Sequence, residues 1–141
     1  MRWPRSAADR RRRPGGILRD QRGSAVVDFV LVLVVLLPLF LGILQLALVL
    51  HVRNTLTAAA SEGARHAAAA DRGPDDGAAY TRRQIRGALA DRFADAVDAS
   101  PTRIDGAPAI EVTVRAEVPA LGLWGPGIGL VVRGHATEED P

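Results

Sequence analysis

One apolar segment constrains the fold of this chain more than any other feature. Residues 29–52 contain no formally charged side chain, if His51 is counted as neutral, and 19 of these 24 residues are Leu, Ile, Val or Phe. As an α-helix the segment would be about 36 Å long, which is enough to cross a hydrocarbon core of about 30 Å. Each large apolar side chain favours insertion by roughly 0.3–0.6 kcal/mol, whereas Asp28 opposes it by at most about 3 kcal/mol. We therefore expect a transmembrane helix over residues 24–52.

Two other interpretations of this segment explain it less well. A core helix that is apolar on all sides would need more protein around it than a chain of 141 residues offers. The apolar part of a cleaved secretory signal is only about 7–15 residues long and is followed by small residues. Small residues do occur at 58–61, but the apolar segment is too long for a signal, so a retained membrane span is the better interpretation.

The distribution of charge predicts the orientation of the span. Residues 1–23 hold eight arginines and two aspartates, a formal charge of +6, whereas residues 24–141 carry a formal charge of −4. Because basic residues beside a span stay in the cytoplasm, we expect a cytoplasmic N-terminus and an extracytoplasmic C-terminus in the cell (inner) membrane. The arginines at 10–13 could instead bind nucleic-acid phosphates. The adjacent span explains them better, and we expect no nucleic-acid partner.

The junction between the basic leader and the span carries a specific pattern. Gly23 ends the leader, Ser24 follows, and Asp28 stands five residues after the glycine in an apolar surrounding. This arrangement resembles a prepilin processing site, at which a membrane peptidase cuts after the glycine. Cutting would create an ammonium at Ser24, which Asp28 of a neighbouring subunit could neutralise and so set the register between subunits. Alternatively, Asp28 is an interfacial carboxylate that reaches water.

A family resemblance extends along the predicted helix. The stretch 23–33, the Leu-Pro-Leu at 37–39, Gly42-Ile43 and the Glu-Gly-Ala-Arg at 62–65 are similar to the TadE-like family. The resemblance implies a minor pilin or pseudopilin of the tight-adherence (Flp) pilus assembly system, held in the lipid bilayer and without catalytic activity. It also implies a prepilin peptidase and other pilins or pilus-assembly proteins as partners. Gln45 stands where members of this family often carry an acid.

Several residues of this helix are candidates for packing against other helices, and each also has a simpler explanation. Pro38 removes a backbone donor and kinks a helix whatever its function. Gly42 permits close helix approach, and Gln45 either bonds to a neighbouring helix or lies near the outer interface. Glu62 and Arg65 are three residues apart, so they are either packing residues or a solvated surface pair.

The remainder of the chain predicts a small extracytoplasmic α+β domain. Residues 53–73 are expected to form a helical stalk and turn, with a stripe of mostly small residues facing a partner helix: Val52, Leu56, Ala59, Gly63 and Ala67. In residues 74–141, apolar residues at every fourth position predict an amphipathic helix over 78–98, followed by turn-rich residues to 108. Alternation predicts a strand over 110–118, paired with a second strand over 129–137 as a hairpin.

Two further features bear on function. Residues 118–132 carry no charge, and Leu123 and Trp124 there are expected either to contact a partner or membrane, or to cover the domain's own core. The histidines at 51, 66 and 135 have no HExxH or other ligand spacing, no GxSxG motif occurs, and cysteine is absent. We therefore expect no enzymatic activity, cofactor or metal. The competing function is an unprocessed single-pass anchor whose outer domain binds an envelope partner or ligand.

Overall fold

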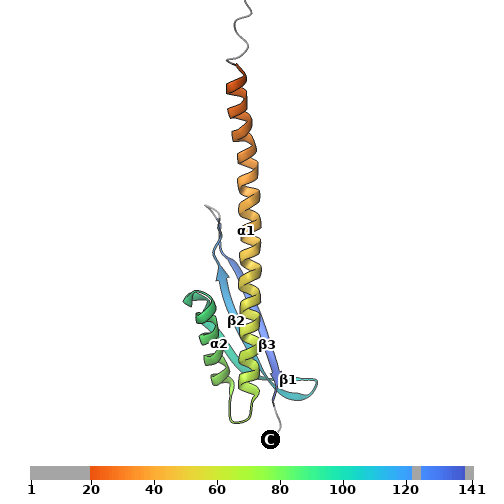
Figure 1. Ribbon diagram of the computed structural model, residues 1–141. Helices are drawn as coiled ribbons and strands as arrows, with labels where there is room; N and C mark the ends of the chain where they lie inside the picture. Colours follow the sequence, from red (N-terminus) through yellow and green to blue (C-terminus); the bar gives the residue numbers. More distant parts are fainter. Residues whose placement is uncertain (1–19, 122–124, 139–141) are drawn as a thin grey trace, which may run out of the picture. The chain divides into compact units, whose positions relative to one another are not determined.

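The structure, a computed structural model, describes residues 20–121 and 125–138 and has an α+β architecture. The chain divides into two compact units, Met1–Leu39 and Phe40–Pro141, whose boundary falls within the first helix. The elements in chain order are α1 (Asp20–Ala68), α2 (Pro74–Ala88), the 3-10 helix η1 (Asp91–Ala94), β1 (Ala96–Ile104), β2 (Ala107–Val118) and β3 (Ile128–Thr137) (Figure 1). The predicted fold class, a long apolar N-terminal helix followed by helix and antiparallel sheet, is confirmed.

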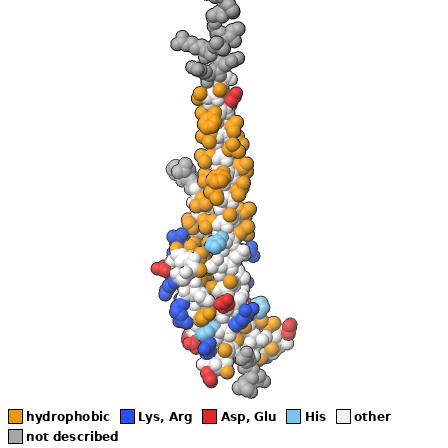
Figure 2. Space-filling model, in the orientation of Figure 1, with side chains coloured by type: hydrophobic (Ala, Val, Ile, Leu, Met, Phe, Trp, Pro, Cys, Tyr) orange, Lys and Arg blue, Asp and Glu red, His pale blue; other side chains and the backbone are white. Residues whose placement is uncertain are grey.

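Helix α1 has 49 residues and is apolar on all sides in its N-terminal part. Every side chain from 23 to 39 is exposed, and Figure 2 shows hydrophobic side chains over this stretch. The helix continues through Pro38. Among the described residues, α1 is the one helix that is long and apolar enough to cross a membrane. A helix that is apolar all round and of this length is suited to cross a membrane, which indicates a single-pass membrane protein.

The second unit contains a three-stranded antiparallel sheet in the order β1-β2-β3. Val114 of the central strand lies opposite Val97 of β1 and Val132 of β3, and all three side chains are buried. The alternating pattern predicted for residues 110–118 is confirmed as part of β2. The strand expected over 129–137 is β3, which pairs with β2 as predicted.

Strand β1 is an additional strand that the sequence analysis does not predict. A two-residue turn joins Ile104 to Ala107, and its central residues Asp105 and Gly106 have φ values of 51° and 85°. Positive φ at both positions is typical of the type I′ turn, which matches the twist of a hairpin, and Asp-Gly is one of its preferred sequences. This dipeptide is the signal that identifies the β1–β2 hairpin.

The helix predicted over 78–98 is wrong at both ends. Helix α2 begins at Pro74, where Asp76 Oδ2 accepts a hydrogen bond of 3.2 Å from the Gly73 amide, and it ends at Ala88. Leu89 is already extended, with φ −133° and ψ 177°. Ile85, Phe93 and Val97 are all buried in one core, but they reach it from α2, η1 and β1 respectively. Together with the partly buried Leu89, they recur at every fourth position because they share one core, and not because they lie on one helix face.

The hydrophobic core lies between one face of the sheet and the two helices. Its members come from α1, α2, η1 and all three strands. The stripe predicted on α1 is buried, at Val52, Leu56, Ala59, Gly63 and Ala67. It packs against α2, a helix of the same chain, and against the sheet. The C-terminal half of α1 is thus part of the core.

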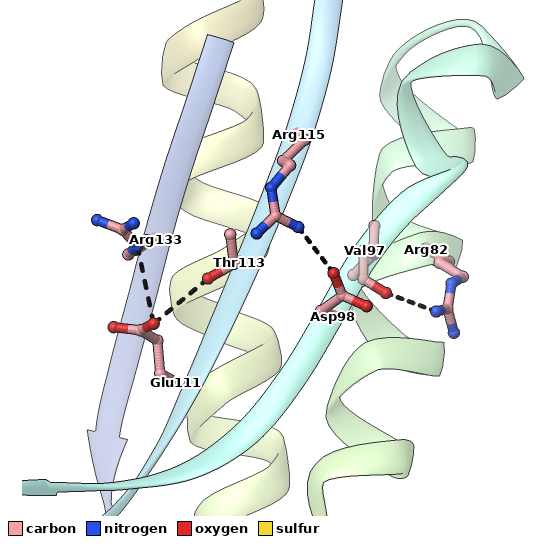
Figure 3. A network of polar contacts seen from close by, with 7 residues as sticks. All are labelled: Arg82, Val97, Asp98, Glu111, Thr113, Arg115 and Arg133. Atoms are coloured by element: carbon pink, nitrogen blue, oxygen red, sulfur yellow. Dashed lines mark hydrogen bonds and ion pairs between the residues drawn. The ribbon is translucent and has the colours of Figure 1, made fainter.

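The opposite face of the sheet is polar (Figure 3). Arg115 Nη1 lies 2.8 Å from Asp98 Oδ2, and Arg133 Nε lies 3.7 Å from Glu111 Oε1. Glu111 is half-buried and the other three side chains are exposed, so each pair contributes about 0–1 kcal/mol. Arg82 Nη2 also donates to the Val97 carbonyl at 2.6 Å and ties α2 to β1. This face is mostly polar and largely exposed to solvent.

Candidate functional site

The three residues of the predicted processing site lie together on α1. Gly23, Ser24 and Asp28 are all exposed and all helical. A Cβ built on Gly23 would meet no atom within 4 Å, so packing among the described residues does not require glycine there. Asp28 follows Ser24 by four residues, which places the two on the same helix face one turn apart. The side chain of Asp28 has no hydrogen-bond or ion-pair partner among residues 23–121 and 125–138.

The predicted helix-packing residues are spread along α1 and do not form one site. Gly42 is exposed, with open space where a Cβ would stand. Glu62 Oε2 accepts a hydrogen bond of 2.9 Å from Gln84 Nε2 of α2, and both side chains are exposed. Arg65 lines an open groove with Ile104 and His135. Within the described part of the chain, the ion pairs are those on the polar sheet face, so Glu62 and Arg65 do not form one.

Gln45 has a role that the sequence analysis does not predict. Its Nε2 donates to the carbonyl of Pro119 at 3.3 Å, and its Oε1 accepts from the amide of Leu121 at 2.6 Å. Both ends of the amide therefore bond to the segment that follows β2. The partners are 74 and 76 residues away in sequence, so no local pattern could identify them.

The other polar groups of the chain do not assemble a catalytic or metal centre within the described residues. The ring of His66 stacks on Tyr80, with centroids 4.4 Å apart, and its Nδ1 lies 2.7 Å from Arg72 Nη1. No three His, Cys, Asp or Glu side chains in this part of the chain are grouped so as to hold a metal ion. The predicted apolar tip at Leu123 and Trp124, and the leader to residue 19, lie outside the described residues.

Comparison with known proteins bears on α1. Residues 23–65 match the family described as TadE-like protein. The chain matches no curated protein and no solved structure. The matched segment begins at Gly23, includes Asp28, Pro38, Gly42 and Gln45, and ends at Arg65, whereas α2 and the sheet lie beyond it. The resemblance predicted from the sequence is therefore confirmed over residues 23–65, which match the TadE-like family.

Proposed function

We propose that the chain is a non-enzymatic component of the tight-adherence pilus assembly system, a minor pilin or pseudopilin. In this proposal a prepilin peptidase cuts between Gly23 and Ser24, and the mature chain acts by helix packing in the membrane or in a filament. The observation that carries the proposal is that the TadE-like match starts at Gly23, at the head of an exposed apolar helix. An association with the pilus system, without cleavage or a stated mode of packing, is supported by the family match of residues 23–65 alone.

The environment of Gly23 supports a role in recognition by a peptidase. Glycine inside a helix costs about 1 kcal/mol relative to alanine. No neighbouring atom within 4 Å requires this cost at Gly23, so packing does not explain the residue. The scissile bond would lie after a leader that holds eight arginines, on the side of the membrane where those arginines remain.

Asp28 is the residue that would link processing to assembly. An uncompensated charge at the membrane edge is costly, and cleavage would add the ammonium of Ser24 one helical turn away. The Asp28 carboxylate is exposed and so is accessible to the ammonium of a second subunit. Pairing of the two charges offsets the desolvation of each, and it does so only at one register between neighbouring helices.

The faces of α1 that remain free define where packing can occur. The stripe from Val52 to Ala67 is already buried in the chain's own core. Partners must therefore contact the apolar stretch 26–44, in which Gly42 allows close approach, or the exposed face that carries Glu62 and Arg65. The first of these surfaces suits a bundle of apolar helices, and the second suits polar contacts outside the membrane.

The mature N-terminus tests the proposal, and the chain offers a matched control. The full chain would be produced with a tight-adherence prepilin peptidase and its mass measured, for the natural sequence, Gly23→Ala and Gly42→Ala. Both glycines are exposed on α1 with open space at the Cβ position, so both substitutions have the same effect on helix propensity. We expect residues 24–141 from the natural chain and from Gly42→Ala, and an uncut chain from Gly23→Ala. An uncut natural chain would overturn the proposal.

The competing function, an unprocessed anchor with a binding domain, draws on one observation. An open groove in the second unit is lined by Arg65, Ile104 and His135, among others, and could receive a ligand or a partner segment. The same mass measurement separates the two functions, because the anchor keeps its leader whatever peptidase is present.

A further inference from the structure

The core of the second unit includes residues that also belong to the predicted membrane span. Leu48 and Val49 are partly buried against the core, and Val52 is 1% exposed. These residues belong to the uncharged run 29–52. The sheet therefore packs beside α1 at the level of the last turns of the predicted span.

Gln45 fixes which part of the sheet lies at that level. Its two hydrogen bonds, to the Pro119 carbonyl and the Leu121 amide, hold the end of β2 beside the helix. As a helix the uncharged run 29–52 would be about 36 Å long, whereas a hydrocarbon core is about 30 Å thick. Gln45 lies in the last third of this run. The bonded segment therefore lies beside the part of the run that we expect at the outer boundary.

Exposed apolar side chains of the second unit lie at this same end. Outside α1, Leu121 is 45% and Ile128 is 41% exposed. Val131, at 57%, lies further along β3, opposite Arg115 on the polar face of the sheet, and does not belong to this group. The neighbouring turns of α1 add Leu46 and Leu50, which are 60% and 48% exposed. Leu46, Leu50, Leu121 and Ile128 are named the apolar rim.

The rest of the unit has a different surface. Within the second unit, the charged side chains visible in Figure 2 lie below the orange stretch, toward the far end of the unit. The far end of the sheet carries the exposed Asp105 in its hairpin turn, and Glu138 follows β3. Charged residues adjoin the rim: the side chain of Glu117 lies against Gly127, and Arg92, Asp95 and Arg115 line a hollow together with Leu130. These residues limit the apolar surface to the rim.

We propose that the apolar rim inserts into the outer interface of the lipid bilayer, as a second membrane contact beside α1. The occupant is phospholipid because the rim is continuous with the exposed apolar turns of α1 in the same unit, which belong to the end of the uncharged run 29–52. Insertion of Leu121 and Ile128, at roughly 25 cal/mol per Å² of apolar surface, favours one tilt and one rotation of the domain. Gln45 is the positioning residue, since it sets the depth of the connection. The inference requires only that α1 spans a membrane, and it does not depend on cleavage or on a pilus.

The absence of cysteine gives a direct test in the full-length chain. Single-cysteine variants carrying a nitroxide would be reconstituted in vesicles of phosphatidylethanolamine and phosphatidylglycerol. Collisions of the label with oxygen, which concentrates in the bilayer, would be compared with collisions with a water-soluble nickel chelate. Leu121→Cys and Ile128→Cys report the rim. Ser100→Cys and Thr137→Cys, both exposed on strands, are the controls, and Leu36→Cys reports the span.

The expected result is that labels at 121 and 128 lose nickel collisions and gain oxygen collisions relative to 100 and 137, as the label at 36 does more strongly. Nickel collisions at 121 and 128 equal to those of the controls would overturn the proposal. Labels shielded from both reagents would overturn it as well, because protein, such as a second copy, would then cover the rim. A water-exposed label at 36 would remove its premise. No pilus component is present, so failure here leaves the proposed cleavage at Gly23 untouched.

Discussion

Gly63 of α1 and Gly77 of α2 lie against each other where the two helices come closest. A Cβ on Gly77 would stand 2.8 Å from the Gly63 carbonyl oxygen, and a Cβ on Gly63 would stand 3.0 Å from the Gly77 carbonyl oxygen. The buried hydroxyl of Thr81 bonds beside them, donating at 2.8 Å to the Gly77 carbonyl and lying 3.4 Å from that of Ala59. Two backbones in contact, with the adjoining polar side chain satisfied, set the distance between α1 and α2.

This contact predicts a large difference between two glycines of the same helix. Gly77→Ala should lower the free energy of unfolding of the second unit by about 1–3 kcal/mol, because the new methyl group overpacks the crossing. Gly87→Ala meets open space, so it should be neutral or stabilise by up to about 1 kcal/mol through helix propensity. Denaturant unfolding in detergent, followed by circular dichroism, checks both. Equal stabilities for the two variants would show that the helices are not in backbone contact.

Gln45 predicts a specific pattern of amide protection. Gln45→Leu removes both hydrogen bonds, so the Leu121 amide should exchange faster and stability should fall by about 1–2 kcal/mol. Gln45→Glu should keep the Leu121 amide protected, since a carboxylate still accepts, but it cannot donate to the Pro119 carbonyl. Gln84→Leu, which removes an exposed side-chain bond, is the control and should change neither quantity. Hydrogen exchange measured by NMR reports the outcome. A Leu121 amide that is equally protected in all variants would contradict the contact.

Asp28 should serve assembly and leave the fold of the second unit unchanged. In the proposed function, Asp28→Ala leaves the ammonium of a neighbouring Ser24 uncompensated, at a cost of about 3–5 kcal/mol. We expect a chain that is processed and stable but no longer crosslinks to co-produced pilus proteins. Asp28→Glu should keep the crosslinks, because it retains the carboxylate on a longer side chain. The exposed surface residue Asp98 provides the control substitution, Asp98→Ala. Normal crosslinking of Asp28→Ala would reduce Asp28 to an interfacial carboxylate.

The charge asymmetry of the chain predicts its topology. A reporter that is active only outside the cytoplasm should be active when fused after Pro141, because the basic residues before Gly23 hold the N-terminus inside. Neutral substitutions of the arginines at 10–13 should weaken this preference and raise the fraction of inverted chains. An active cytoplasmic reporter at the C-terminus, with an inactive external one, would show that the orientation is the opposite. The leader would then lie on the outer side of the membrane, where the prepilin peptidase could not cut it.

The sequence by itself determined the features that depend on neighbouring residues. The length and apolarity of α1 follow from one uninterrupted segment, since burial in lipid requires no particular tertiary partner. Strand β2 follows from the alternation of apolar and polar residues, because successive side chains of a strand point to opposite faces of the sheet. The TadE-like pattern likewise lies within 43 consecutive residues, from 23 to 65, and was recognisable without a structure.

Only the tertiary structure decided how the second half of the chain uses its residues. Ile85, Phe93 and Val97 read as one helix face, but they enter a common core from three different elements, because burial outweighs local helix propensity. The Asp105-Gly106 dipeptide identifies a hairpin only when the residues on both sides of it are known to be strands that pair, as β1 and β2 do. The bonds of Gln45 join residues more than 70 positions apart. Contacts between distant segments depend on how the chain closes in space, and a pattern of neighbouring residues does not record that.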